Sequence, residues 1–371
     1  MSSDNAVSSD NAVSSDNAVS SDNRLPSDNG LPSDNRLPSD NRLPSDNGLP
    51  SDNGLPSDDG LPSDNAYEAL SEGGNDARWA YGTGFADPLE GVDTTMPAGT
   101  DAADLTAYCL MLGDDALIMS HRLQQCCTNA PELEDEVALA NIALDLLGQA
   151  RLLLSRAAAA EVAANGTGRG PADDSDSDGP QRGEDFYAFF RAEYEFRNVR
   201  LTELDRGDFG ELIARLLVFA AWRLAVLRRL TSSRDPVLAA IAAKGVKEVT
   251  YHRDYAAQWL IRLGDGTAFS RERAQAGLAA IWPYVAELFT PHEIERRLAA
   301  AGVAADPAGL RGEFDDVLAQ VLPAATLEVP DVPPRAGVAG RTGRDGVHTE
   351  AMGYLLAELQ SVARADPEAT W

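Results

Sequence analysis

From residue 101 onward, the chain carries apolar residues at intervals of three and four, the spacing that places side chains on one face of an α-helix. The first such segment, 101–127, contains Leu105, Tyr108, Leu112, Ala116 and Met119. Similar segments, separated by stretches rich in Gly, Pro, Asn and Asp, predict helices over 132–164, 184–204, 209–232, 235–263, 271–289, 292–301, 307–321 and 348–364. The sequence shows no convincing alternation of apolar and polar residues, so it predicts an all-α protein built as a helical bundle.

A six-residue repeat occupies the first 66 residues. It reads Ser-Asp-Asn-Ala-Val-Ser three times and then Ser-Asp-Asn-(Arg/Gly)-Leu-Pro, making ten copies, with Asp59 once in place of Asn. Such a repeat buries too little apolar surface to offset the entropy of ordering, so we expect disorder. A six-residue β-helix is the alternative, but the recurrent Pro removes backbone donors. We therefore divide the chain into a disordered repeat (1–66), a Gly- and Pro-rich linker (67–100) and a helical domain (101–371).

The charge balance argues against several classes of partner. The chain has 59 acidic and 31 basic residues, a net charge of -28, which disfavours nucleic acids and anionic membranes. Residues 1–66 contain twelve Asp and three Arg and so carry -9, which leaves -19 on the rest of the chain. No apolar run approaches the roughly 18 residues of a membrane span. The first residues lack the features of a signal peptide, and three cysteines give no disulfide framework, so we expect a cytoplasmic protein.

Lysine is nearly absent from this chain. Only Lys244 and Lys247 occur among its 31 basic residues, and the others are arginine. An acidic, lysine-poor surface is what we expect of a protein kept soluble in concentrated salt, where screening relieves self-repulsion. We therefore favour a halophilic host, with GC-biased codon usage as the alternative explanation for the arginines.

The segment Lys247–His252 bears on metal chemistry. In di-iron carboxylate bundles each of two helices supplies Glu-x-x-His, so that a carboxylate and an imidazole project toward a shared pair of metal ions. Three residues before His252 stands Val249, which has no donor atom for iron. The segment is therefore half of such a site with its glutamate missing.

Five segments together resemble the accessory, ferritin-like subunits of bacterial phenylacetyl-CoA epoxidases. The match spans roughly residues 102–371 and rests on 108–114 (YCLMLGD), 140–151 (ANIALDLLGQAR), 247–252 (KEVTYH), 262–267 (RLGDGT) and 346–350 (GVHTE). The resemblance implies a ferritin-like four-helix bundle with additional helices. It further implies a complex that epoxidises the aromatic ring of phenylacetyl-CoA with O2, in aerobic phenylacetate degradation.

In the catalytic sister subunit, the resemblance implies, both Glu-x-x-His motifs hold two irons. The same frame places Leu146 and Gln149 at the first motif of this chain, and Val249 and His252 at the second. Independently of that frame, the predicted helix 209–232 has no acidic residue after Glu211, although a di-iron bundle needs an inward Glu there. We therefore expect no metal, no cofactor and no catalytic residue in this chain.

The implied partners are the catalytic di-iron subunit, further oxygenase components, and a flavin and iron-sulfur reductase that delivers electrons from NADPH. This chain would stabilise the catalytic subunit through its long helices. Contact elements could be the aromatic segment 184–204 and the late helices with Trp282, Tyr284 and Tyr354, because aromatic residues are favoured in interfaces. The same aromatic residues could equally be core.

Two other classes of function remain open. The first is an independent di-iron oxidase or oxygenase with a shifted metal site, because Glu248 and His252 share a helix face and could meet Asp114, Asp145 or Glu195. The second is a structural protein with an adhesive repeat tail. Against a shifted site, acidic residues on helices of an acidic protein are usually solvated, and a lone His is more often a structural residue.

A charge pair could replace the metal. Both lysines fall in the helix that carries Val249 and His252. We therefore expect Lys247, or less readily Lys244, to pair in the vacated centre with Asp145, Asp114 or Glu248.

Overall fold

The computed structural model describes residues 89, 91–164 and 183–367. The chain divides into two units, Met1–Ala77 and Arg78–Trp371. The hexapeptide repeat and most of the predicted linker lie outside the described residues, so the expected disorder of the repeat stays a prediction.

The described part of the second unit is all-α. Its only β-type pairing is an isolated bridge between Val338 and Arg341. The longer helices are α1 (Ala102–Cys126), α2 (Leu133–Ala164), α4 (Phe209–Leu230), α5 (Pro236–Asp265), α6 (Ala268–Ile281), α7 (Glu293–Ala300), α8 (Arg311–Ala324) and α9 (Glu350–Ala365). Short helical turns join them: η1 (Cys127–Asn129), η2 (Phe186–Phe190), η3 (Glu193–Glu195), α3 (Arg200–Glu203), η4 (Trp282–Phe289), η5 (Pro307–Leu310) and η6 (Gly343–Asp345).

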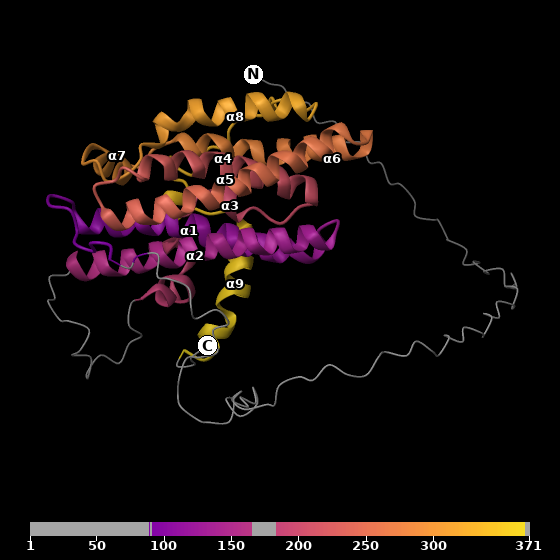
Figure 1. The fold of residues 1–371 in the computed structure, drawn as a ribbon. Coiled ribbons are helices and arrows are strands. Elements are labelled where there is room, and N and C mark those ends of the chain that lie inside the picture. The colour runs from indigo at the N-terminus through magenta and orange to yellow at the C-terminus, as the bar shows by residue number, and fades with distance from the viewer. Residues whose placement is uncertain (1–88, 90, 165–182, 368–371) are drawn as a thin grey trace, which may run out of the picture. The chain divides into compact units, whose positions relative to one another are not determined.

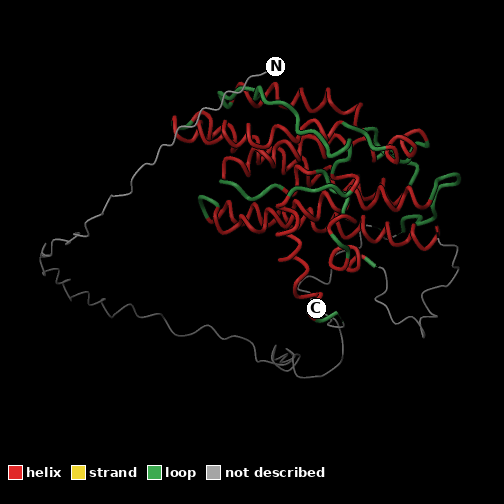
Figure 2. Tube along the Cα trace, turned by 180° about the vertical axis from the view of Figure 1, so that it is seen from behind, coloured by secondary structure: helices red, strands yellow, loops and turns green. Residues whose placement is uncertain are grey.

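Four long helices form the bundle. Helix α1 packs along α2, α4 packs along α5, and α2 also contacts α5, so that the two pairs enclose one core (Figure 1). Helices α6 and α8 cover the outer side of the α4–α5 pair. Helix α9 is not aligned with the long helices but crosses their direction at a large angle (Figures 1 and 2). This arrangement is a ferritin-like bundle with additional helices, as the sequence predicted.

Local chemistry fixes where the bundle helices begin. The Asp208 carboxylate accepts from the Glu211 N–H at 2.8 Å at the start of α4, and Asp235 accepts from the Leu238 N–H at 2.9 Å at the start of α5. Such N-caps satisfy donors that the first helical turn leaves unpaired. Helix α4 is buried on nearly all sides, as expected of a central helix without a wide polar stripe.

The predicted helix 184–204 is wrong as a continuous element. The structure instead has a π-helical turn at η2, a 3-10 turn at η3, extended residues 196–199 and the single turn α3. The reason lies on α1, where two buried carboxylates accept backbone N–H groups from this segment. The Arg197 N–H donates to Asp114 at 2.8 Å, and the Val199 N–H donates to Asp115 at 2.8 Å. These donors are therefore used by α1 and not by helical bonds within the segment.

The predicted helix 271–289 also changes character. Helix α6 ends at Ile281, and η4 continues as a 3-10 helix with Pro283 near its start. Proline has no N–H and its ring clashes with the preceding turn, which ends a regular α-helix.

Helix α2 departs from one sequence expectation. It is long and apolar enough to cross a membrane by length and composition, although 44% of its most apolar window is buried inside the bundle. The expectation that no apolar run approaches the length of a span is therefore wrong for this helix. Because the core helix of a soluble protein passes the same test, the finding is weak evidence for a membrane.

Candidate functional site

The four positions predicted from the di-iron frame meet between α2 and α5. Leu146 and Gln149 on α2, and Val249 and His252 on α5, are all buried. Two of the four are apolar and a third is a neutral amide. The bundle therefore brings the expected positions together but gives them the character of a core.

A polar chain starts from Gln149. Its Nε2 donates to Glu248 Oε2 at 2.8 Å, and Glu248 Oε1 lies 3.4 Å from Lys244 Nζ, which is half-exposed. Gly245 makes room for the amide, because a Cβ there would lie 3.0 Å from Leu227 and 3.4 Å from Gln149. A path of polar contacts thus runs from the buried Gln149 to the surface.

Arg223 of α4 forms the buried end of this chain. Its Nε donates to Gln149 Oε1 at 2.9 Å and its Nη1 to the Leu112 carbonyl at 3.3 Å, while its Nη2 has no hydrogen-bond partner among the described residues. Burial lowers the pKa of Arg223 to about 10, so the guanidinium is still charged at neutral pH. We call Arg223, Gln149, Glu248 and Lys244 the central relay.

Sequence reasoning missed Arg223. The predicted helix 209–232 lacks a carboxylate after Glu211 but carries arginines, among them Arg223 in its apolar middle. An arginine in the middle of a nearly carboxylate-free apolar helix was the available signal, because a buried guanidinium must find hydrogen-bond partners.

His252 uses a different partner. Its Nε2 lies 3.0 Å from Asp145 Oδ2; the ring is buried, whereas 38% of the Asp145 side chain is exposed. This contact joins α5 to α2 at the edge of the centre. Of the carboxylates considered for a shifted site, Asp145 is therefore the one that reaches His252.

Two predicted members of the charge network lie elsewhere. Lys247 is exposed and forms no ion pair or hydrogen bond with any residue that the structure describes. Asp114 is buried but binds Arg191, through Nη1 at 3.0 Å and through Nη2, and not a lysine. The pairing expected first, that of Lys247, is not found among the described residues; the second alternative, Lys244 with Glu248, is found at the rim, and Arg223 lies inside.

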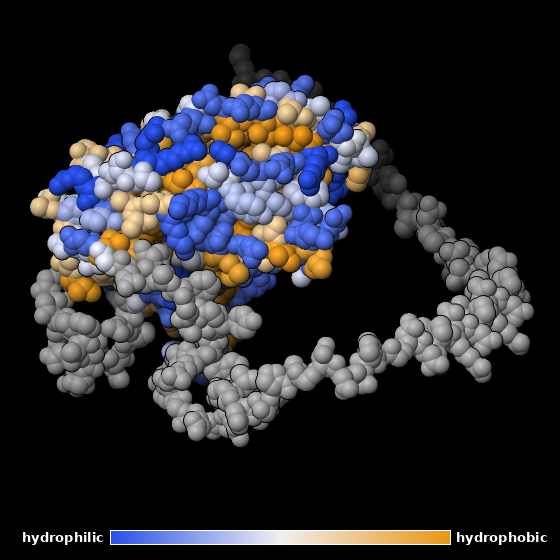
Figure 3. Space-filling view, in the orientation of Figure 1, coloured by the Kyte–Doolittle hydropathy of each residue, from blue (hydrophilic) through white to orange (hydrophobic). Residues whose placement is uncertain are grey.

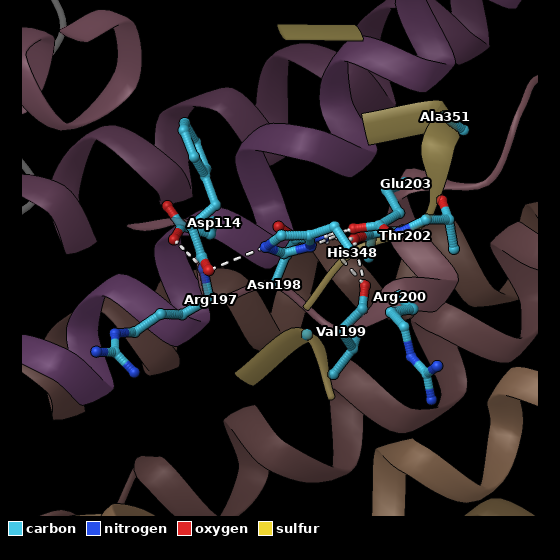
Figure 4. Close-up of polar contacts among 12 residues, drawn as sticks. Asp114, Arg197, Asn198, Val199, Arg200, Thr202, Glu203, His348 and Ala351 are labelled. Carbon is cyan, nitrogen blue, oxygen red and sulfur yellow. Dashed lines mark hydrogen bonds and ion pairs between the residues drawn. The ribbon is translucent and has the colours of Figure 1, made fainter. Parts of the chain in front are cut away.

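A second polar system is built around two carboxylates of α1. Asp115 binds Arg344 of η6 through two hydrogen bonds, at 3.0 and 2.9 Å, beside the Asp114–Arg191 pair. Both acids also accept backbone N–H groups from 197–199, as Figure 4 shows for Asp114 and Arg197. We call the pairs Asp114–Arg191, Asp115–Arg344 and Glu203–His348 the paired layer.

The Glu203–His348 pair closes this layer. His348 Nδ1 lies 2.7 Å from Glu203 Oε2 and Nε2 lies 3.0 Å from the Phe196 carbonyl, so both ring nitrogens face acceptors (Figure 4). Only the imidazolium can donate both bonds. Burial alone would lower the pKa of His348, but the hydrogen bond to Glu203 and its charge outweigh burial and raise the pKa.

The residues of the centre do not fit a di-iron group. Iron sites of this type need several carboxylates and imidazoles, and here the four positions are Leu, Val, Gln and one His, beside a guanidinium. Within 91–164 and 183–367, no group of three or more His, Cys, Asp or Glu side chains could hold a metal ion. The positive charge of Arg223 would in addition repel a cation.

The helices and their buried polar core define the class: a ferritin-like four-helix bundle protein. The chain belongs to the family described as phenylacetic acid catabolic protein, whose model matches residues 90–371. It is similar to one of the subunits of the 1,2-phenylacetyl-CoA epoxidase of Escherichia coli (strain K12), with 43% identity over 268 residues that cover 72% of this chain and 99% of that protein. The resemblance to subunits of this epoxidase, inferred from five motifs, is confirmed.

Proposed function

We propose that this chain is the non-catalytic, structural subunit of a multicomponent di-iron monooxygenase that epoxidises the ring of phenylacetyl-CoA in the cytoplasm. A sister subunit with both Glu-x-x-His motifs would hold the irons, and further oxygenase components and a reductase would complete the system. The observation that carries the proposal is the chemistry of the centre: Leu146, Val249 and the Arg223–Gln149 contact stand where metal ligands would be needed.

Iron binding tests this part of the proposal. The purified chain, incubated with ferrous iron under anaerobic conditions and desalted, should retain far less than one iron per chain. A stoichiometry near one or two would favour the alternative, an independent di-iron oxidase or oxygenase with a site around His252 and Asp145. The variant His252→Ala should then lose that iron, whereas under the structural proposal it changes nothing measurable in the assay.

The outer face of α2 is the surface we assign to the sister subunit. Leu133, Val137 and Leu144 of α2 and Tyr251 of α5 are exposed, and the first three follow one face of the helix. A row of exposed apolar side chains is unusual on a chain with a net charge of -28, and exposed apolar surface of this kind marks protein interfaces. Figure 3 shows apolar side chains along the lower edge of the bundle, where α1 and α2 lie.

Matched substitutions test this surface. Leu144 on α2 is 59% exposed and Val362 on α9 is 58% exposed, so changing each to Arg alters a similar amount of surface. Co-expressed with a ferritin-like chain that retains both Glu-x-x-His motifs, Leu144→Arg should lose the complex in size-exclusion chromatography and Val362→Arg should keep it. The opposite result would move the interface to α9, where the predicted contact residue Tyr354 is also exposed.

A further inference from the structure

A cavity of about 220 Å³ lies between α1, α2 and the π-helical turn η2, away from the central relay. Its walls are largely apolar and come from all three elements: Leu117, Leu147, Ala150, Leu154, Ala188 and Phe189. Neither the centre nor the paired layer contributes a charged group to it. Nothing in the proposed function uses this cavity.

The third wall of the cavity is held in place from two sides. On the α2 side, Glu184 binds Arg151 Nη2 at 2.6 Å and Ser155 Oγ at 2.7 Å. On the α9 side, Arg364 Nε donates to the Phe189 carbonyl at 3.0 Å. The wall itself is a π-helical turn, a conformation that recurs at functional sites. The cavity is therefore preformed and does not depend on a ligand to order it.

His121 supplies the polar group at the α1 side of the cavity. Its imidazole forms no hydrogen bond with any residue that the structure describes, and the side chain is partly buried where it lines the cavity. Burial lowers the pKa of His121 to about 4, so the ring is neutral at physiological pH and offers one donor and one acceptor. A neutral imidazole beside apolar walls can exchange its contact with water for a hydrogen bond to the polar group of a ligand.

We propose that this cavity binds uncharged, single-ring aromatic molecules that carry a hydroxyl or amide group, with the ring against the apolar walls and the polar group on His121. An apolar cavity of about 150 Å³ already holds a benzene ring, so the volume here suits one ring with a short substituent. Anionic ligands are disfavoured, because Arg151 is already paired with Glu184 and Asp185 adds a negative charge at the rim.

Ligand-observed NMR on the full chain tests the proposal, with benzyl alcohol, toluene and benzoate as probes. Benzyl alcohol should give saturation transfer that is displaced by phenylacetamide, toluene should bind several-fold more weakly, and benzoate should show no transfer. Equal transfer to all three probes, or none to benzyl alcohol, would overturn the proposal.

Variants of the cavity make the site assignment specific. His121→Phe should weaken benzyl alcohol about tenfold and leave toluene unchanged, because only the hydrogen bond is lost, whereas His121→Gln should retain most of the affinity. Ala188→Leu should fill the cavity and abolish binding of both probes. Ala319→Leu, at an exposed position of α8 outside this cavity, is the control and should bind like the natural chain. Circular dichroism of each variant confirms folding, and unchanged binding in both His121→Phe and Ala188→Leu contradicts the assignment.

Discussion

The paired layer and the inner end of the central relay, Arg223 with Gln149, are both buried in the same bundle, yet they handle charge differently. In the paired layer each carboxylate meets a guanidinium or imidazolium directly, as in Asp115 with Arg344. In the central relay the Arg223 guanidinium meets a neutral amide, and the nearest carboxylate of the relay, Glu248, is one residue further on. The paired layer balances each charge by direct contact, whereas in the central relay a neutral amide separates the Arg223 guanidinium from the Glu248 carboxylate.

This difference follows from which segments of the chain each system joins. The paired layer fastens irregular chain, residues 191–203 and 343–349, onto α1, and those segments have few helical bonds of their own. Gly346 shows how close this fastening is, because it has a positive φ of 74° and a Cβ there would lie 2.0 Å from the Tyr194 carbonyl. The central relay joins regular helices that also pack through apolar residues. We therefore expect the paired layer to matter more for stability.

The largest effect should come from Asp115→Asn. The substitution keeps an acceptor for the Val199 N–H but removes the hydrogen-bonded countercharge of the buried Arg344, which should lower the free energy of unfolding by about 3 to 5 kcal/mol. Urea unfolding followed by circular dichroism measures this loss. Asp315→Asn is the control, since its pair with Arg311 is about half exposed, and it should cost less than about 1 kcal/mol. Equal losses for the two variants would remove the basis of the comparison.

The next effect concerns pH. Since the folded-state pKa of His348 is raised above its ordinary value of 6.5, the stability it contributes is fully present below pH 6.5 and is lost as the pH rises through the folded value. Deprotonation leaves one ring nitrogen facing an acceptor without a hydrogen, a loss of about 1 to 3 kcal/mol. Hydrogen exchange of α9, whose start is fixed by Glu203 and Arg122, should accelerate on the alkaline side.

His348→Gln provides the control for this pH dependence. Glutamine cannot carry the charge, so the variant should be less stable at neutral pH and its α9 exchange, after correction for the intrinsic rate, should no longer change over that range. A pH dependence that survives in the variant would assign the effect to another group.

The sequence predicted the regular part of the fold well and the polar core poorly. Helix α5 was expected over 235–263 and is found at Pro236–Asp265, because an Asp N-cap and a following Pro mark such a start locally. The break in 184–204 depends on Asp114 and Asp115, about 80 residues away, which no local pattern reveals. Boundaries set by neighbours are predictable, whereas those set by buried charges on another helix are not.

The error over Lys247 was avoidable. Successive residues of an α-helix turn by about 100°, so Lys247 lies about 200° from Val249 and faces away from the side on which Val249 and His252 are buried. The rarity of lysine suggested a role, but the helical geometry already excluded the centre for that side chain. The Asp145–His252 contact occurs only in the alternative that the sequence disfavoured, the shifted metal site, and the Arg223–Gln149 contact was not predicted.

A smaller effect should follow from replacing the central relay. The double variant Arg223→Met with Gln149→Met exchanges a buried cation and an amide for apolar side chains, and Glu248 keeps Lys244 and access to solvent. Such replacements of buried ionic groups are often neutral or stabilising, so we expect a loss of less than about 1 kcal/mol in urea unfolding. Gln149→Met alone, which strands the Arg223 Nε, should be the less stable of the two variants. A loss of about 3 kcal/mol or more in the double variant would mean that the central relay contributes as much to stability as the paired layer does.

Added salt should change the electrostatic contribution of the surface charges to stability much more than that of the two buried systems. At about 1 M salt the screening length falls to about 3 Å, so repulsion among the excess exposed carboxylates of a chain with net charge -28 is largely removed. Under the halophilic hypothesis, the unfolding free energy of the natural chain rises with KCl.

The loss of stability caused by Asp115→Asn should stay nearly constant across KCl concentrations, because the Asp115–Arg344 pair is buried and poorly screened. Unfolding curves of both chains across KCl concentrations measure the two quantities together. Stability that does not rise with KCl ends the halophilic hypothesis, and a penalty that shrinks with KCl would mean that the Asp115–Arg344 pair is reached by solvent.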